Sequence, residues 1–108
     1  MNLPAGIETE FDRAQQARLK GNEGQARVCA RRAAGLAIRE YFTRQGMQIS
    51  STSAYDLLNL LKEDSLLPLN LKLAADRLTM RVTEEFKLPV EVDLVAEARA
   101  LCDWALNK

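Results

Sequence analysis

The sequence predicts an all-α fold, an up-and-down bundle of about five helices in a single domain over residues 1–108. Leucine and alanine dominate the chain, whereas Val and Ile are few and never alternate with polar residues over the length of a strand. Apolar residues recur instead every three to four positions, which is the spacing of one helix face. The length of 108 residues suits one hydrophobic core.

The first helix is expected over about residues 6–20. Ile7, Phe11 and Ala14 fall at helical spacing on one face. Gly21 and Asn22 are expected to end this helix, because both residues tolerate the left-handed backbone conformation of a helix end.

The second helix is expected over about residues 24–45, and its apolar residues form two stripes. The main stripe consists of Ala26, Ala30, Ala33, Ala37 and Tyr41. A thinner stripe on another face consists of Val28, Gly35 and Phe42, seven residues apart. A helix that is apolar on two sides is usually central in a bundle or shared with a second copy of the chain.

Three shorter helices complete the predicted bundle. The third begins after Ser53, a favourable N-cap, and Pro68 prevents its continuation. The fourth covers about residues 71–85 with Asn70 as its expected cap, and the fifth covers about residues 94–106 after Asp93. The expected buried positions are Leu57, Leu58 and Leu61, then Leu71, Ala74, Ala75, Leu78 and Val82, and finally Val95, Ala98, Leu101, Cys102 and Ala105.

The composition bounds the location and the partners of the protein. Lys and Arg number 15, as do Asp and Glu, so no net charge attracts the whole chain to nucleic acid or to a membrane. No stretch approaches the roughly 20 apolar residues that span a bilayer, and no secretory signal precedes the first helix. Two cysteines within helical patterns predict small core residues rather than disulfides. We therefore expect a cytoplasmic protein without a membrane partner.

The residue types favour binding over catalysis. The chain contains no histidine, the side chain best suited to proton exchange near neutral pH. Without histidine, and with only two separated cysteines, zinc ligation would need an all-carboxylate site. The segment KGNEG has glycines but lacks the Lys-Ser/Thr pair of a phosphate-binding loop. We predict no catalytic residue, no metal and no cofactor, and hence no enzyme.

Four segments together resemble the HEPN domain superfamily (higher eukaryote and prokaryote nucleotide-binding) over about residues 7–106. They are ARVCARRAAGLAIREYF, SAYDLLNLLKEDSLLP, AADRLTMRVTEEFKLPVEVD and AEARALCDWAL, with the turn Phe86–Lys87–Leu88–Pro89 and with Trp104 in the last helix. The resemblance implies a helical up-and-down bundle and a nucleotidyltransferase as a partner. Catalytic members carry an Arg followed after four to six residues by a His, and no His follows Arg77 or Arg99 here. The resemblance is therefore to a non-catalytic member.

Two other functions stay open at this point. One is a degenerate HEPN ribonuclease that uses carboxylate and arginine chemistry. The other is a tetratricopeptide-like adaptor that binds a peptide, because the stretch from Ala17 to Ala26 is similar to such hairpins. That family repeats about every 34 residues, and no second copy of the pattern follows.

The second helix also carries an excess of positive charge. From Gln25 to Gln45 there are five arginines, at positions 27, 31, 32, 39 and 44, against one acid, Glu40. On a helical wheel Arg31, Arg32 and Arg39 cluster around the thinner apolar stripe.

Three interpretations of this arginine-bordered face remain open. Arg31, Arg32 and Arg39 could bind the phosphate of a nucleotide or RNA while Phe42 stacks on a base. Val28, Gly35 and Phe42 could instead form a self-association surface of a homodimer with an arginine rim. The arginines could also only solvate the bundle or pair with Glu91, Asp93 and Glu97. The leading expectation is a non-catalytic module that engages a protein partner, itself, or a nucleotide or RNA through this face.

Overall fold

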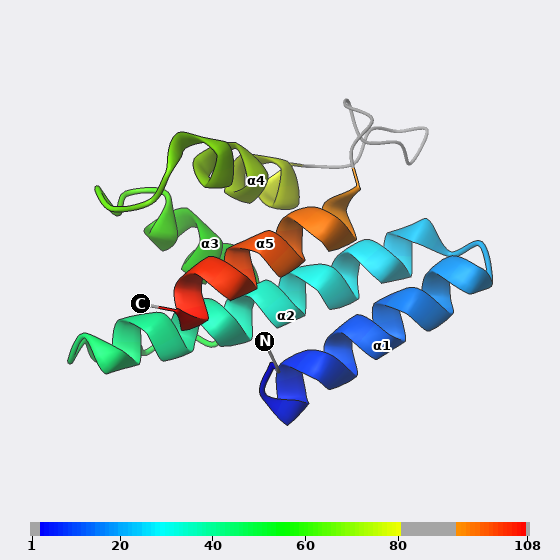
Figure 1. The fold of residues 1–108 in the computed structure, drawn as a ribbon, viewed down its shortest axis with the longest axis horizontal. Helices are drawn as coiled ribbons and strands as arrows, with labels where there is room; N and C mark the ends of the chain where they lie inside the picture. The colour runs from blue at the N-terminus through cyan, green and yellow to red at the C-terminus, as the bar shows by residue number, and fades with distance from the viewer. Residues whose placement is uncertain (1–2, 81–92, 108) are drawn as a thin grey trace.

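The structure, a computed structural model, describes residues 3–80 and 93–107, and over those ranges it consists of five α-helices without a strand (Figure 1). The helices are α1 (Ala5–Leu19), α2 (Glu23–Arg44), α3 (Ala54–Leu61), α4 (Leu69–Thr79) and α5 (Leu94–Leu106). The predicted all-α bundle of about five helices is confirmed. The predicted first, second and fifth helices begin and end within one residue of the observed ones.

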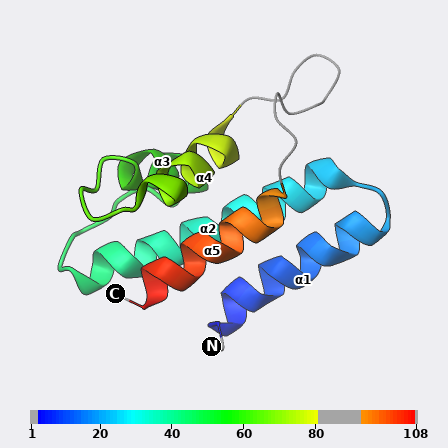
Figure 2. The ribbon, with the colours of Figure 1, turned by 45° about the horizontal axis from the view of Figure 1, so that its top comes forward.

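α2 is the central helix of the bundle. α1 runs antiparallel to it, α5 runs beside it in the same direction, and α3 packs on it as well (Figures 1 and 2). The predicted inward stripe is confirmed, because every member is at most 1% exposed: Ala26, Ala30, Ala33, Ala37 and Tyr41. Alanine side chains are short, so they allow the helix axes to approach closely.

The turn between α1 and α2 follows the predicted stop signal. Gly21 adopts a φ of 76°, which costs glycine little because it has no Cβ. The side chain of Asn22 accepts a hydrogen bond from the backbone N–H of Gln25 and caps α2. The short turn therefore makes α1 and α2 a helical hairpin.

Arg18 of α1 connects the N-terminal ends of α2 and α5. Its guanidinium lies 2.8 Å from a carboxylate oxygen of Glu23 and 3.1 Å from one of Asp93. Asp93 also caps α5 by accepting hydrogen bonds from the N–H groups of Val95 and Ala96. Partial burial opposes ionisation of Asp93, but the hydrogen bonds from Ala96 and Arg18 outweigh burial and lower the pKa of its carboxyl.

The start of α4 differs from the prediction. Asn70 was expected as the N-cap, and this is wrong, because α4 begins at Leu69 and Asn70 lies in its first turn. The preceding residue is Pro68, whose carbonyl accepts hydrogen bonds from the N–H groups of Leu71 and Lys72 at 3.0 Å. Its ring fixes φ near the helical value, so Pro68 suits the residue before a helix.

The end of α4 also differs from the prediction, which extended this helix to residue 85. The helix ends at Thr79, and Met80 is extended with a ψ of 143°. The Thr79 hydroxyl donates to the carbonyl of Ala75 at 2.9 Å, a local bond that often accompanies irregularity in a helix. The predicted buried position Val82, the turn 86–89 and Glu91 lie outside the described residues.

The predicted core of α3, α4 and α5 is confirmed for the described residues, with one exception. Val95 is only partly buried, since it lies in the first turn of α5 at the edge of two buried clusters. Trp104 packs against the core from α5, with its ring centroid 5.0 Å from that of Tyr41. In the ranges 3–80 and 93–107 no helix has the length and apolar character needed to cross a bilayer.

α3 comes into close contact with α2 at Gly35. A Cβ added at Gly35 would lie 2.8 Å from the Cβ of Ala54 and 3.0 Å from its Cα, closer than real Cβ atoms come. The absence of a side chain at position 35 therefore allows the first turn of α3 to rest on α2.

Replacement of this glycine should destabilise the fold. In a helix interior Gly→Ala ordinarily gains about 1 kcal/mol, but here the added methyl must push backbone apart, and overpacking costs about 1–3 kcal/mol. We expect Gly35→Ala to lower the free energy of unfolding by about 1 kcal/mol, the difference between these two effects, measured by urea denaturation. Gly6→Ala is the matched control, because its Cβ would meet only the end of Leu36 at 3.8 Å. A Gly35→Ala protein as stable as the Gly6→Ala protein would contradict the proposed close contact.

A hydrogen bond fixes the loop between α3 and α4 to α2. The hydroxyl of Tyr41 donates to a carboxylate oxygen of Asp64 at 2.6 Å. The other oxygen of Asp64 accepts from the N–H of Leu66 at 2.8 Å. Burial and the bond to Asp64 raise the pKa of the Tyr41 hydroxyl.

Removal of the Tyr41 hydroxyl should cost stability at neutral pH. A hydrogen bond to a charged group contributes about 1.5–3 kcal/mol, so Tyr41→Phe should lower the free energy of unfolding by an amount of that order. Because the folded protein holds this proton more tightly, wild type should also lose stability as the pH rises above about 10, and Tyr41→Phe should lack that part of the loss. Tyr55→Phe, at an exposed tyrosine, should leave the free energy of unfolding at neutral pH unchanged. Identical alkaline curves for wild type and Tyr41→Phe would exclude the bond.

Candidate functional site

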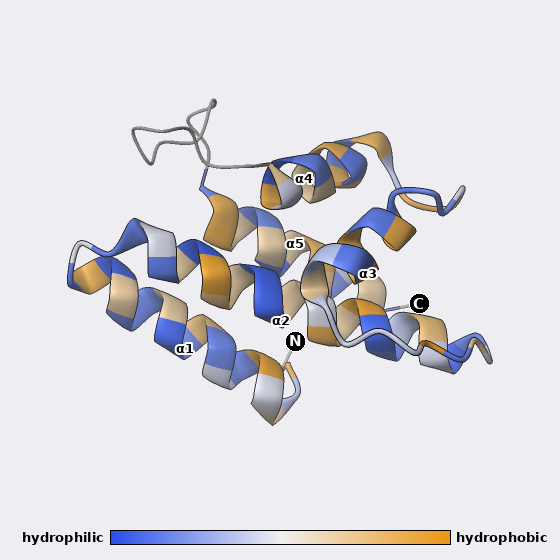
Figure 3. Cartoon of the chain, turned by 180° about the vertical axis from the view of Figure 1, so that it is seen from behind, coloured by the Kyte–Doolittle hydropathy of each residue, from blue (hydrophilic) through white to orange (hydrophobic). Residues whose placement is uncertain are grey.

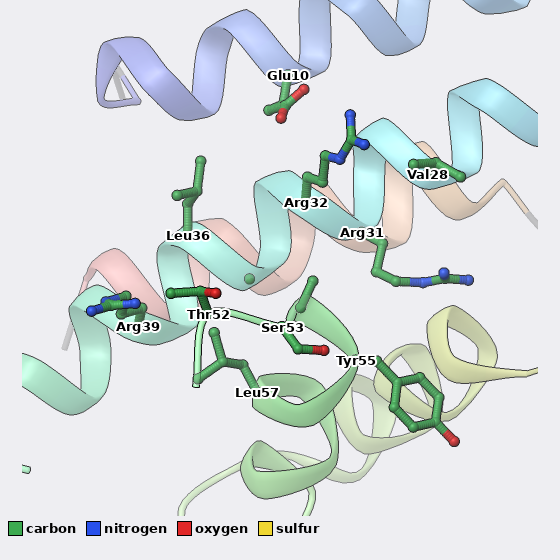
Figure 4. Close-up of a pocket in the computed structure, with 12 residues that line it drawn as sticks. Glu10, Val28, Arg31, Arg32, Leu36, Arg39, Thr52, Ser53, Tyr55 and Leu57 are labelled. Carbon is green, nitrogen blue, oxygen red and sulfur yellow. The ribbon is translucent and has the colours of Figure 1, made fainter. Parts of the chain in front are cut away.

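A groove of about 500 Å³ lies over α2, between α1 and the beginning of α3 (Figure 4). We call it the α2–α3 groove. It is lined by Glu10, Val28, Arg31, Arg32, Gly35, Leu36, Arg39, Thr52, Ser53, Ala54, Tyr55 and Leu57. The structure thus brings the three arginines predicted as binding residues to one surface feature, and Val28 and Gly35 lie there with them.

Local structure explains why α3 forms one wall of this groove. The side chain of Ser53 accepts a hydrogen bond from the N–H of Asp56 and caps the helix, as predicted. The hydroxyl of Ser51 donates to the Asp56 carboxylate at 3.0 Å and orders the loop before the helix. Contact between Gly35 and Ala54 then holds the capped end against α2.

Arg31 has a structural role in addition to its place in the groove. Its Nε donates a hydrogen bond of 2.8 Å to the carbonyl of Leu78, in the last turn of α4. This bond satisfies a carbonyl that the helix end leaves without a partner in α4. Burial, together with the positive charge of Arg27, lowers the pKa of Arg31 from its ordinary value, although the guanidinium stays charged at neutral pH.

Arg32 and Arg39 differ from Arg31. Within residues 3–80 and 93–107 neither side chain forms a hydrogen bond or an ion pair. In the close-up Arg32 points toward α1, while Arg31 and Arg39 extend in opposite directions along α2 (Figure 4). The groove therefore contains cationic groups that no acid of the described chain neutralises and that do not converge on one point.

The acids predicted as partners of these arginines pair elsewhere. Asp93 binds Arg18, and Glu97 binds Arg77 at 2.6 Å between α4 and α5. That expectation is therefore wrong for both acids, because the chain places them beside α1 and α4. Of the other two arginines of α2, Arg44 pairs with Glu40 at 3.0 Å and donates to the carbonyl of Leu106. Arg27 is half-buried, and its Nε is buried without a hydrogen-bond partner in the described structure.

Phe42 does not lie in the groove. It is 4% exposed, its ring centroid lies 5.2 Å from that of Tyr41, and it belongs to the same buried cluster as the leucines of α3. Gly35 is also buried, under Ala54. The predicted stripe of Val28, Gly35 and Phe42 therefore forms no exposed surface for stacking or self-association, because α3 and the core cover two of its three members.

Leu36, Tyr55 and Glu10 are among the groove residues that sequence reasoning missed. Leu36 is 46% exposed, and Tyr55 is 47% exposed. The exposure of both residues could have been predicted from their helical positions. Leu36 shares a face with Arg32 and Arg39, and Tyr55 lies off the leucine face of α3. Glu10 comes from α1, and no local pattern indicates that it lies next to the groove.

Glu10 places one negative charge at the α1 side of the groove. Its nearest cation is Arg13, with a separation of 3.6 Å between Oε1 and Nη1. Oε1 is buried without a hydrogen-bond partner among the described residues. Hydrophilic and hydrophobic positions alternate on this side of α2, between α1 and α3 (Figure 3). The lining of the groove thus combines apolar side chains, three arginines and one acidic residue, Glu10.

The described residues offer little for acid–base or thiol chemistry near the groove. Cys29 and Cys102 are both buried, and the Cys102 thiol donates a weak hydrogen bond to the carbonyl of Ala33. Burial raises the pKa of Cys102 to about 12, so its thiolate is scarce at neutral pH. No group of three or more Cys, Asp or Glu side chains in residues 3–80 and 93–107 is arranged to hold a metal ion.

Compared with known proteins, the chain matches no family model, no curated protein and no solved structure. The resemblance to HEPN domains therefore stays a prediction from the sequence.

Alanine substitutions of the three groove arginines should differ in their effect on the free energy of unfolding. Arg31→Ala removes the bond to Leu78 and leaves a partly buried carbonyl without its partner, which should cost about 1–2 kcal/mol. Arg32→Ala and Arg39→Ala should change the free energy of unfolding by less than about 0.5 kcal/mol. Urea denaturation of the three variants measures both effects. Equal losses of unfolding free energy in all three variants would show that the hydrogen bond from Arg31 to Leu78 does not stabilise the fold.

Proposed function

We propose that this chain is a binding module without catalytic function, which docks a partner protein in the α2–α3 groove. The observation that carries the proposal is the pairing of unneutralised arginines, Arg32 and Arg39, with the exposed apolar side chains of Leu36 and Tyr55. Arginine and tyrosine are enriched where proteins bind proteins, and an apolar centre within a polar rim is the usual anatomy of such surfaces.

The charge distribution favours a protein over nucleic acid as the occupant. The chain has a net charge of zero and a pI near 6.3, so it lacks the overall positive field that draws proteins to nucleic acid. The three groove arginines point in different directions, and Glu10 would repel a phosphate that approached Arg32. These features disfavour a clustered phosphate site and suit scattered charges on a protein surface.

The resemblance to HEPN domains suggests which partner to try first. It implies a nucleotidyltransferase, and this suggestion is part of the proposal. A second copy of the chain is a weaker candidate, because the stripe expected to mediate self-association is largely buried.

A peptide-display selection tests the proposal. Panning a library of random 15-residue peptides against the immobilised protein should enrich binders whose affinity falls about tenfold or more on Leu36→Asp, because the substitution places a charge at the apolar centre of the groove. Fluorescence polarisation measures the affinities. Leu19→Asp is the matched control, since Leu19 is 72% exposed and lies outside the groove; it should leave the affinities unchanged.

Three results would contradict the proposal. The first is an absence of enriched peptides, and the second is a set of peptides that bind Leu36→Asp as tightly as wild type. The third is a dimer by light scattering that dissociates on Leu36→Asp, which would assign the groove to self-association.

A further inference from the structure

From the spacing of side chains along α2, we infer that the partner presents an amphipathic helix with a defined charge pattern. This helix carries acidic residues at positions i and i+7 and a large apolar residue at i+3 or i+4. The inference rests on the proposed function, because it describes the chemistry of the segment that occupies the same groove.

The arginines available for pairing set the distance between the acids. Arg31 already donates to the Leu78 carbonyl, whereas Arg32 and Arg39 have no partner among the described residues. Arg32 and Arg39 are seven residues apart, two helical turns, or about 10.5 Å along the axis of α2 at 1.5 Å per residue. A helix that lies along α2 repeats the same rise, so acids seven residues apart face both arginines.

An apolar residue separates the two arginines. Leu36 follows Arg32 by four residues and precedes Arg39 by three, so it shares their face. It is 46% exposed, and Val28 and Leu57 also line the groove. Along this face of α2 an apolar side chain, Leu36, therefore lies between two cationic ones, Arg32 and Arg39. A complementary partner helix has an apolar side chain between two acidic ones. Insertion of an amphipathic helix into an apolar groove is a common mode of peptide recognition.

Glu10 orients the occupant within the groove. It lies on the α1 side, toward which Arg32 points, so it repels an acid of the partner that approaches Arg32 from that side. The α3 side presents Thr52, Ser53 and Tyr55, which carry no charge at neutral pH. A phosphorylated segment, with its double charge, is disfavoured beside Glu10 for the same reason.

A library on a helical scaffold tests the inference. Four positions of a monomeric helical protein, i, i+3, i+4 and i+7, are randomised and panned separately against wild type and against Arg32→Glu/Arg39→Glu. Wild type should select Asp or Glu at i and i+7 and Leu, Ile, Met or Phe between them. The charge-reversed variant should select Lys or Arg at the same two positions, because opposite charges across an interface determine the choice of partner.

Affinities of individual binders supply the quantitative test. An acidic binder should lose about tenfold or more in affinity for Arg32→Glu/Arg39→Glu, and a binder with two lysines in place of its acids should recover it. Lys20→Glu/Lys72→Glu makes the same change of net charge outside the groove, and it should alter affinity by less than about threefold, a long-range effect that salt screens. Glu10→Gln should strengthen acidic binders about two- to fivefold, because it removes the negative charge that lies near Arg32. Circular dichroism checks that each variant keeps its helical content.

The outcomes distinguish this inference from the proposed function. Helical binders that are lost on Leu36→Asp but lack acids at i and i+7 would overturn the inference and leave the docking groove in place. Binders whose acids are indifferent to the Arg32→Glu/Arg39→Glu charge reversal would do the same. A single-stranded oligonucleotide that binds more tightly than every selected helix, and loses binding on that reversal, would overturn both proposals.

Discussion

Close packing around the small side chains of α2 is the constraint on which the rest of the structure depends. Ala30, Ala33 and Ala37 are completely buried where α2 meets its neighbours. Larger residues at these positions would force the axes apart, since well-packed cores tolerate added volume poorly. Gly35 extends the same principle to α3, whose first turn rests directly on the glycine. The groove exists because α3 begins at this contact and so stands beside the arginines of α2.

The arginines of α2 lie on one helix but differ in the contacts that they make. Arg31 and Arg44 each donate to a backbone carbonyl, at the ends of α4 and α5 respectively. They thereby connect α2 to two other helices. Arg32 and Arg39 make no such connection in the described part of the chain, and this difference is the reason we propose them as binding residues. A count of positive charge along the helix does not distinguish the two kinds of arginine.

Much of the fold could be predicted from the sequence, because its determinants are local. The alanine stripe of α2 and the caps at Ser53 and Asp93 depend on residues within a few positions of one another. The burial of Phe42 could not be predicted, since periodicity identifies an apolar stripe but not the element that covers it. The hydrogen bond from Arg31 to Leu78 could not be predicted either. It joins residues 47 positions apart, and its acceptor is a backbone carbonyl, which every residue has.

The candidate groove was predicted in part for a related reason. Its arginines lie on one helix, so their common face follows from spacing alone. Glu10 and Tyr55 reach the groove from α1 and α3, and their positions depend on how those helices pack in three dimensions. Local patterns therefore identified the groove arginines but not the contribution of Glu10 or of Tyr55 to the groove.

The buried thiols have a practical consequence for spectroscopy. Cys29 and Cys102 are the two cysteines of the chain, and both lie in the interior of the folded protein. A maleimide fluorophore attached to a new cysteine at the exposed position Leu73 would therefore label a single site while the native cysteines stay in place. Energy transfer to such a dye would follow the arrival of a tagged partner in real time.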